Sequence, residues 1–168
     1  MNKRRSFYTV LAGMALVAMG SASTVSADHL GAHMPLVSGA EQGAPLVTTF
    51  KSPTCGCCAD WEDHLREEGF SVRSIETHDM GSIKAEAGVP NGLGSCHSAH
   101  VEGYVVEGHV PAGAIRKLLS ERPEGVHGIA VPGMPIGSPG MEVPGRAAES
   151  FDVIAFDERG RTTVYKSY

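Results

Sequence analysis

Stretches rich in β-branched and aromatic residues alternate along the chain with stretches whose apolar residues recur at helical spacing. Residues 45–51 (PLVTTFK) are typical of a strand. Next, Cys58, Trp61 and Leu65 recur at i, i+3 and i+7 and so share one helix face. The whole pattern predicts the order β-α-β-α-β-α-β-β, with strands at 45–51, 70–76, 99–106, 151–156 and 162–165 and helices at 57–68, 79–87 and between Pro111 and Pro123.

This alternation predicts an α/β domain with a partly parallel sheet. The last two strands flank residues 157–160 (DERG), which favour a β-hairpin that closes the sheet. Residues 124–150 contain four prolines and many glycines, and we expect them to form one long loop of functional importance. The order matches a thioredoxin-like layout, with a central mixed sheet flanked by helices.

The N-terminal residues predict secretion. Lys3, Arg4 and Arg5 precede an apolar run at 7–19, and small residues end a cleavage site at Ala27. Residues 1–27 are thus predicted to be a signal peptide. The apolar run is shorter than the roughly 20 residues that span a membrane. We expect a periplasmic protein without membrane attachment, with a flexible tail at 28–44 and one domain at 45–168.

Composition and charge exclude some function classes. Hydrophobic residues make up 42% and charged residues 20%, as in an ordinary soluble domain. The formal charge is −5, and loss of the signal peptide removes three basic residues and no acidic ones. This acidity argues against a nucleic-acid partner, because phosphate binding needs clustered Lys and Arg.

The motif Cys55-Gly56-Cys57-Cys58 lies where the first strand is expected to end and the first helix to begin. The positive end of a helix dipole stabilises thiolates there. Three cysteines within four residues staple little chain, so we favour free thiolates over structural disulfides. The pair Cys55 and Cys58 also suits a thiol–disulfide oxidoreductase with Cys55 as nucleophile, although Cys57 beside it invites mispairing.

A second cluster, Cys96-His97, lies in the turn before the third predicted strand. In a thioredoxin-like layout this turn faces the tip of the first helix, so we expect Cys96 to approach the CxCC motif. His97 is a better candidate ligand than His100, because it adjoins a cysteine. His109 precedes a helix and could either ligate a metal or cap that helix, whereas His64 is expected at the surface.

Met134 and Met141 lie in the Pro/Gly-rich loop without a periodic apolar face. Thioethers beside thiolates favour Cu(I) over hard cations. A structural zinc site is an alternative for the cysteines and histidines, but the methionines have no role in it. His29 and His33 near the new N-terminus could also bind copper, and we give them little weight.

The segments CGCC with Trp61, GVPNGLGSCH, GYVVEGHVP and AVPGMPIGSPGME together resemble the CopG-type family of secreted bacterial copper-resistance proteins, formerly a domain of unknown function. The resemblance spans residues 45–168. It implies a thioredoxin-like fold and periplasmic copper binding, and it carries to these residues: Cys55, Cys57, Cys58, Cys96, His97, His109, Met134 and Met141.

The function expected is therefore that of a copper-homeostasis protein holding one or more Cu(I) ions, with other periplasmic copper-handling proteins as candidate partners. Cycling between Cu(I) and Cu(II) stays open as an enzyme activity. All of this requires Cys96 to reach the CxCC motif, and a structure with these sulfur atoms on opposite sides of the molecule would refute it.

Overall fold

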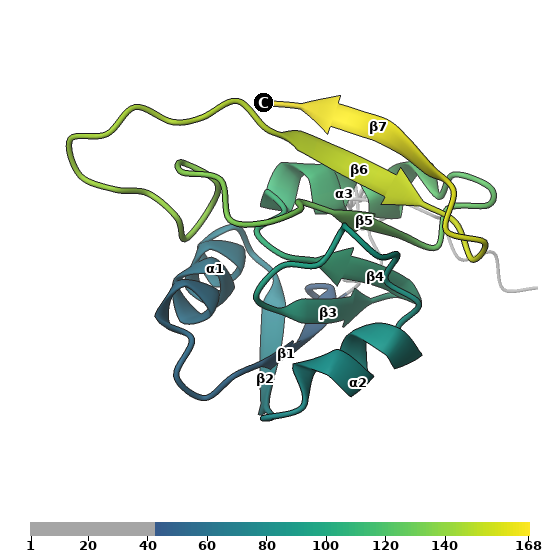
Figure 1. Cartoon of the computed structure of the whole chain (residues 1–168), viewed down its shortest axis with the longest axis horizontal. Helices are drawn as coiled ribbons and strands as arrows, with labels where there is room; N and C mark the ends of the chain where they lie inside the picture. The colour runs from purple at the N-terminus through teal and green to yellow at the C-terminus, as the bar shows by residue number, and fades with distance from the viewer. Residues whose placement is uncertain (1–42) are drawn as a thin grey trace, which may run out of the picture. The chain divides into compact units, whose positions relative to one another are not determined.

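The computed structural model describes residues 43–168. The predicted signal peptide, and the predicted tail up to residue 42, lie outside the described residues. Within them, no helix has the length and apolar character needed to cross a membrane. The elements along the chain (Figure 1) are β1 (Leu46–Lys51), α1 (Gly56–Glu67), β2 (Ser71–Glu76), α2 (Met80–Glu86), β3 (Ser98–Val101), β4 (Tyr104–Glu107), α3 (Ala112–Glu121), β5 (Gly128–Ala130), β6 (Asp152–Phe156) and β7 (Thr162–Ser167).

The strands form one mixed sheet in the order β2-β1-β3-β4-β5-β6-β7. The pairs β1–β2 and β4–β5 are parallel, and the other neighbours are antiparallel. The predicted α/β fold with a central mixed sheet is confirmed, and so is the C-terminal hairpin of β6 and β7. The order β2-β1-β3-β4, with α1 between two parallel strands, agrees with the thioredoxin-like layout expected from the sequence.

The single strand predicted at 99–106 is wrong, because the structure has a hairpin of β3 and β4 there. The turn consists of Glu102 and Gly103, whose φ angles are 45° and 88°. Two positive φ angles give a turn whose twist suits a two-residue hairpin. Apolar residues on both sides of the turn hide it in the sequence pattern. The reversal pairs Ser98 with Glu107 and so brings the chain before β3 beside the chain after β4.

The uninterrupted loop predicted at 124–150 is also wrong, because β5 lies within it. This strand has three residues, all buried, and it joins β4 to β6. Gly128 is needed there, since a Cβ atom would lie 2.5 Å from the carbonyl oxygen of Val105 and 2.6 Å from the ring of Phe156. Three residues are too few to produce a recognisable periodicity.

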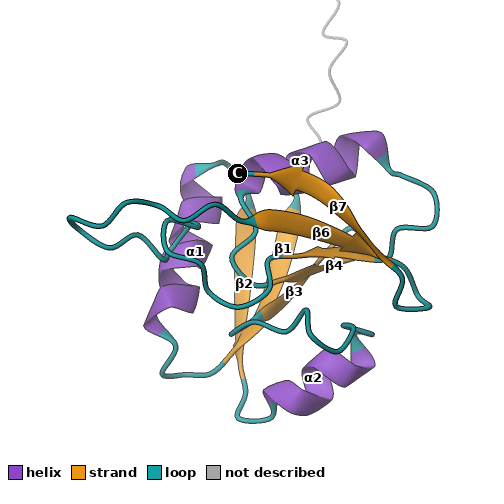
Figure 2. Ribbon diagram, turned by 45° about the horizontal axis from the view of Figure 1, so that its top comes forward, coloured by secondary structure: helices purple, strands orange, loops and turns teal. Residues whose placement is uncertain are grey.

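Helices cover both faces of the sheet (Figure 2). On one face α1 and α3 bury Trp61, Leu65, Ile115 and Leu118 completely. On the other face, the segment that follows α2 packs with Phe156 and its neighbours. Each fully buried large apolar side chain contributes about 1.5–3 kcal/mol. The N-terminus of α1 is therefore held on a rigid core.

Candidate metal centre

The CxCC motif is positioned by the end of β1 and the first turn of α1. Cys55 is the N-cap residue of α1, with extended backbone angles, and its N–H donates to the carbonyl of Ser52 at 3.1 Å. Cys58 lies on the buried stripe of α1 and has no exposed surface, as its helical spacing predicts. Cys55 and Cys57 are half-buried, so neither thiol lies open at the tip of the helix.

Cys55 and Cys58 form a disulfide, whereas Cys57 and Cys96 are free thiols. The preference for free thiolates within the CxCC motif is thus wrong for this pair. An extended N-cap followed by one helical turn brings the two Cα atoms to 5.4 Å, within the range that a disulfide bridges. The bonded pair is the one on which the oxidoreductase alternative depends.

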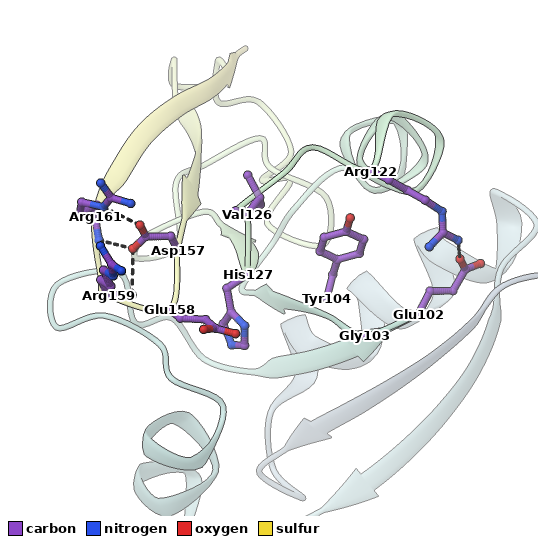
Figure 3. Close-up of a pocket in the computed structure, with 11 residues that line it drawn as sticks. Glu102, Gly103, Tyr104, Arg122, Val126, His127, Asp157, Glu158, Arg159 and Arg161 are labelled. Atoms are coloured by element: carbon purple, nitrogen blue, oxygen red, sulfur yellow. Dashed lines mark hydrogen bonds and ion pairs between the residues drawn. The ribbon is translucent and has the colours of Figure 1, made fainter.

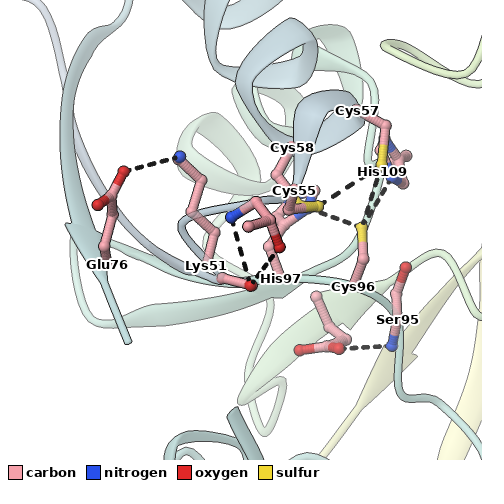
Figure 4. Close-up of a disulfide and its surroundings, with 12 residues drawn as sticks. Lys51, Cys55, Cys57, Cys58, Glu76, Ser95, Cys96, His97 and His109 are labelled. Carbon is pink, nitrogen blue, oxygen red and sulfur yellow. Dashed lines mark hydrogen bonds and ion pairs between the residues drawn. A yellow bond between two sulfur atoms is a disulfide. The ribbon is translucent and has the colours of Figure 1, made fainter. Parts of the chain in front are cut away.

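Cys96 reaches the CxCC motif, as predicted from the order of the elements. The Sγ atom of Cys57 lies 3.6 Å from that of Cys55 and 4.0 Å from that of Cys96 (Figure 4). Thirty-nine residues separate Cys57 from Cys96 in the chain. The antiparallel pairing of β1 with β3, which places Ser98 opposite Phe50, brings the second segment to the tip of α1. The hairpin of β3 and β4 then brings the residues after Glu107 to the same place.

Two imidazoles complete the cluster on the other side of Cys96. Its Sγ atom lies 3.0 Å from Nε2 of His109 and 3.3 Å from Nδ1 of His97. Nδ1 of His109 donates to the carbonyl of Pro139 at 2.8 Å, which fixes the tautomer and leaves the Nε2 lone pair facing Cys96. His97 is fully buried, its ring centroid 4.3 Å from that of Trp61. Its Nε2 atom has no hydrogen-bond partner among the described residues.

The ligand atoms thus form two overlapping groups, in each of which all atoms lie within 4.8 Å of one another. One group consists of the four cysteines, and the other of Cys96, His97 and His109. Cys96 belongs to both. Thiolates and imidazoles are the donors that Cu(I) and Zn²⁺ prefer, so the residues present fit a soft metal ion.

Burial sets the protonation of this cluster. It raises the pKa of the Cys96 thiol to about 12, and the neighbouring Cys57 adds to the shift. Burial lowers the pKa of His97 to about 3 and also lowers the pKa of His109. Near neutral pH the imidazoles are therefore neutral and able to ligate, whereas the Cys96 thiol has to release a proton when it binds a metal.

The Pro/Gly-rich loop approaches the cluster at two points. Gly140 packs on α1 so closely that a Cβ atom would lie 2.7 Å from the carbonyl oxygen of Cys57, and Met141 follows it. The carbonyl of Gly133 accepts a hydrogen bond from the Ser95 hydroxyl, and Met134 follows Gly133. Met134 is 51% exposed. Each methionine thus follows a glycine that contacts a residue at or next to the cluster. The role of the methionines as ligands stays a prediction.

The other histidines of residues 43–168 lie outside the cluster. His100 is on β3 and packs edge-on against Phe50, in agreement with its lower rank as a ligand. His64 is not simply a surface residue, because its Nε2 atom accepts a hydrogen bond from the N–H of Ala112 at 3.3 Å. It caps α3, whose N-cap residue Pro111 makes no side-chain cap.

A hollow of about 570 Å³ lies at the other end of β4, beside Tyr104 (Figure 3). Two ion pairs lie along it, Arg122 with Glu102 and Arg161 with Asp157. The histidine that lines it, His127, makes its hydrogen bond with the carbonyl of Ala87 and not with a cysteine. The hollow therefore offers no cluster of soft ligands.

Three comparisons place this arrangement among known proteins. Residues 93–141 match the family model described as "Protein of unknown function, DUF411". No curated protein sequence matches the chain. A solved structure of "Copper resistance protein copG", Form 2, is 40% identical, with a TM-score of 0.70, and the match covers 74% of this chain and 98% of that one.

Form 1 of the same protein is 41% identical, with a TM-score of 0.68, and the match covers 73% of this chain and 96% of that one. Each match thus covers nearly the whole length of the solved structure. The chain therefore belongs to the CopG-type family of copper-resistance proteins.

Proposed function

We propose that this protein binds copper as Cu(I) in the periplasm and thereby serves copper resistance. The observation that carries the proposal is the convergence of two soft-ligand groups on Cys96. Cys96 connects the sulfur atoms at the tip of α1 with the imidazoles of His97 and His109. A hard-cation site would need oxygen ligands instead, and neither group contains a carboxylate.

The overlap of the two groups supports binding of more than one ion. A thiolate sulfur has several lone pairs, so Cys96 is able to bridge two ions that the other ligands hold from either side. Cys58 and His97 are fully buried, which protects a bound Cu(I) from water and oxidants. Met134 and Met141 are the candidate thioether ligands from the adjoining loop.

The redox state of the cysteines controls how many ligands are available. With Cys55 and Cys58 bonded, two free thiols remain. Adding two electrons and two protons to this disulfide gives two more thiols. The chain then has four thiols, all in one ligand group. We infer that the fully reduced protein is the form with the higher copper capacity.

An anaerobic competition titration tests the proposal. The fully reduced protein without residues 1–27 is titrated with Cu(I) against a chromogenic chelator, and separately with Zn²⁺. We expect Cu(I) to be taken from the chelator, with more than one ion bound per chain and with Zn²⁺ bound more weakly. Failure to compete for Cu(I) would refute the proposal. Zn²⁺ affinity equal to the Cu(I) affinity, with loss of both zinc and stability in Cys→Ser variants, would favour the structural zinc site.

The bonded pair Cys55–Cys58 supports a second candidate, a thiol–disulfide oxidoreductase. Insulin reduction distinguishes it from copper storage. Activity that survives Cys57→Ser and Cys96→Ser but not Cys55→Ser would identify this function. Absence of activity in the wild type would exclude it.

The periplasmic location follows from the predicted signal peptide and has its own test. We expect the protein in the periplasmic fraction of a producing bacterium, with a mass that corresponds to cleavage after Ala27. Recovery of the uncleaved chain in the cytoplasm would contradict the location without affecting copper binding. Partner proteins that handle copper in the same compartment are expected to exchange the ion with this protein.

A further inference from the structure

Glu107, the last residue of β4, is a charged side chain buried without any exposed surface. Three donors surround its carboxylate. The N–H of Ser95 donates to Oε1 at 2.6 Å, the hydroxyl of Ser98 donates to Oε2 at 2.5 Å, and Nζ of Lys84 lies 2.5 Å from Oε1. Taking a carboxylate out of water is costly, so a group this well satisfied indicates a specific role.

Two of these donors, Ser95 and Ser98, lie on either side of the Cys96-His97 pair. Ser95 directly precedes Cys96, as Figure 4 shows, and Ser98 directly follows His97. One carboxylate thus holds both ends of the Cys96-His97 turn. Two residues further along the chain from Glu107 is His109, the imidazole that faces Cys96 at 3.0 Å.

Gly108 strengthens this connection. Its N–H donates to the carbonyl of His97 at 3.0 Å, and its φ angle is +73°. A Cβ atom at Gly108 would lie 2.5 Å from the Ser95 side chain, so the two segments pack without room for a larger residue. The backbone between Glu107 and His109 is therefore fixed against the turn that carries Cys96.

We propose that Glu107 is a positioning residue of the metal centre, which holds Cys96 and His97 in register with His109. This inference rests on the proposed function, since it assigns Glu107 a role in the copper site. Glu107 touches no candidate ligand atom and acts through Ser95 and Ser98. A carboxylate is required because two acceptor oxygens serve three donors, whereas an amide would turn its NH₂ group toward at least one of them.

The test uses Glu107→Gln, which keeps the shape of the side chain, with Glu102→Gln as the matched control at the other end of the same hairpin. Glu102 lies in the turn of the hairpin, at the opposite end of β4 from Glu107, and forms an ion pair with Arg122. In an anaerobic Cu(I) competition titration we expect Glu107→Gln to weaken binding by about 10- to 100-fold, the usual effect of losing an outer-shell partner. The control should bind as the wild type does.

A metal-free measurement separates this inference from copper binding itself. With the Cys55–Cys58 disulfide intact, only Cys57 and Cys96 react with a short thiol-to-thiol crosslinker, and their Sγ atoms lie 4.0 Å apart. We expect slower crosslinking in Glu107→Gln than in the wild type and in Glu102→Gln. If the wild type bound no Cu(I), the proposed function would fail, and the crosslinking rates would still decide the role of Glu107.

A double-mutant cycle distinguishes positioning from general destabilisation. If Glu107 acts by aligning Cys96 with His109, Glu107→Gln has little further effect on Cu(I) affinity in a His109→Ala background. A full additional loss in that background, or wild-type affinity and crosslinking in Glu107→Gln, would overturn the proposal. If Glu107→Gln did not fold, Ser98→Ala would remove a single donor, and an unchanged crosslinking rate in that variant would also overturn it.

Discussion

The two ends of strand β4 carry two different kinds of polar chemistry. At the Tyr104 end, a hollow is bordered by guanidinium and carboxylate groups that pair with each other. At the Glu107 end, sulfur and imidazole atoms form two overlapping groups, and within each group all atoms lie within 4.8 Å of one another. One imidazole nitrogen there has no hydrogen-bond partner in residues 43–168. The first region is a hollow of about 570 Å³ bordered by ion pairs, and the second gathers soft ligand atoms.

If the cluster binds copper as proposed, the size of a hollow is a poor guide to function here. Exposed ion pairs satisfy their own charges in water and contribute little to stability or binding. Half-buried thiols and neutral imidazoles instead offer lone pairs that a soft metal ion prefers. If this account is right, changes in the two regions have very different effects on copper binding and on stability.

The largest effect is expected from Cys96→Ser, because Cys96 belongs to both ligand groups. Loss of a bridging ligand should weaken Cu(I) binding by more than the roughly 100-fold that outer-shell changes cause. The matched change in the hollow is Arg161→Gln, which breaks an ion pair with Asp157 away from the cysteines and should leave Cu(I) affinity unchanged. Competition titration of both variants checks this, and similar losses in the two would remove the distinction between the regions.

Reduction of the Cys55–Cys58 disulfide should have the next largest effect. Thiol titration of the unfolded chain should rise from two to four groups per molecule, and the copper bound per chain should rise with it. The measurement is Cu(I) stoichiometry before and after reduction under exclusion of oxygen. Cys55→Ser with Cys58→Ser should bind at the lower stoichiometry in both states, and equal capacity of the two wild-type forms would contradict the four-cysteine group.

The acid sensitivity of the metal-free protein distinguishes the regions in a third way. Burial holds the pKa of His97 at about 3, against 6.5 for the free side chain. The unfolded chain binds this proton first as pH falls, so the stability present above pH 6.5 is lost progressively toward pH 3. Between pH 7 and pH 4 the loss from His97 should be on the order of 2–3 kcal/mol.

Thermal unfolding against pH tests this expectation with the variant His97→Gln, whose melting temperature should fall less on acidification than that of the wild type. In the hollow, hydrogen bonds from Arg161 hold the pKa of Asp157 below its usual value of 3.8, so any stability that this group contributes is lost only below that pH. Asp157→Asn should therefore change the acid profile far less than His97→Gln. A wild-type profile in His97→Gln would show that His97 is not the group responsible.

The smallest effects are expected from the methionines. Met141→Leu should weaken Cu(I) binding a few-fold, because Met141 follows the glycine that packs against Cys57. Met134→Leu should do so less, since Met134 is half exposed. Competition titrations at fixed pH compare the two, with Val143→Leu in the same loop as the control. Wild-type affinity in both methionine variants would confine the ligands to cysteine and histidine.

Local patterns in the sequence predicted much of the fold. The spacing of Cys58, Trp61 and Leu65 indicated both the first helix and its buried face. The hairpin of β6 and β7 followed from its alternating strands and turn residues. The turn at Glu102 and the three-residue strand β5 escaped prediction, because the first lacks the usual Asn-Gly signal and the second is too short for a period to appear.

The sequence predicted the candidate site only in part. Cys96 was expected near the CxCC motif from the order of the elements alone, and the structure brings it there. The disulfide between Cys55 and Cys58 depends on a Cα separation that no sequence pattern specifies. Glu107 and the carbonyl of Pro139 carried no signal, since one is an ordinary strand residue and the other is backbone.

The sequence by itself determined which donors the protein possesses: four cysteines, eight histidines and a Pro/Gly-rich loop with methionines, on an α/β chain. The tertiary structure decided which of them meet. Distances between residues tens of positions apart, such as Cys57 and Cys96, depend on strand pairing and on tight turns. Protonation depends on burial, which arises only when the helices pack on the sheet.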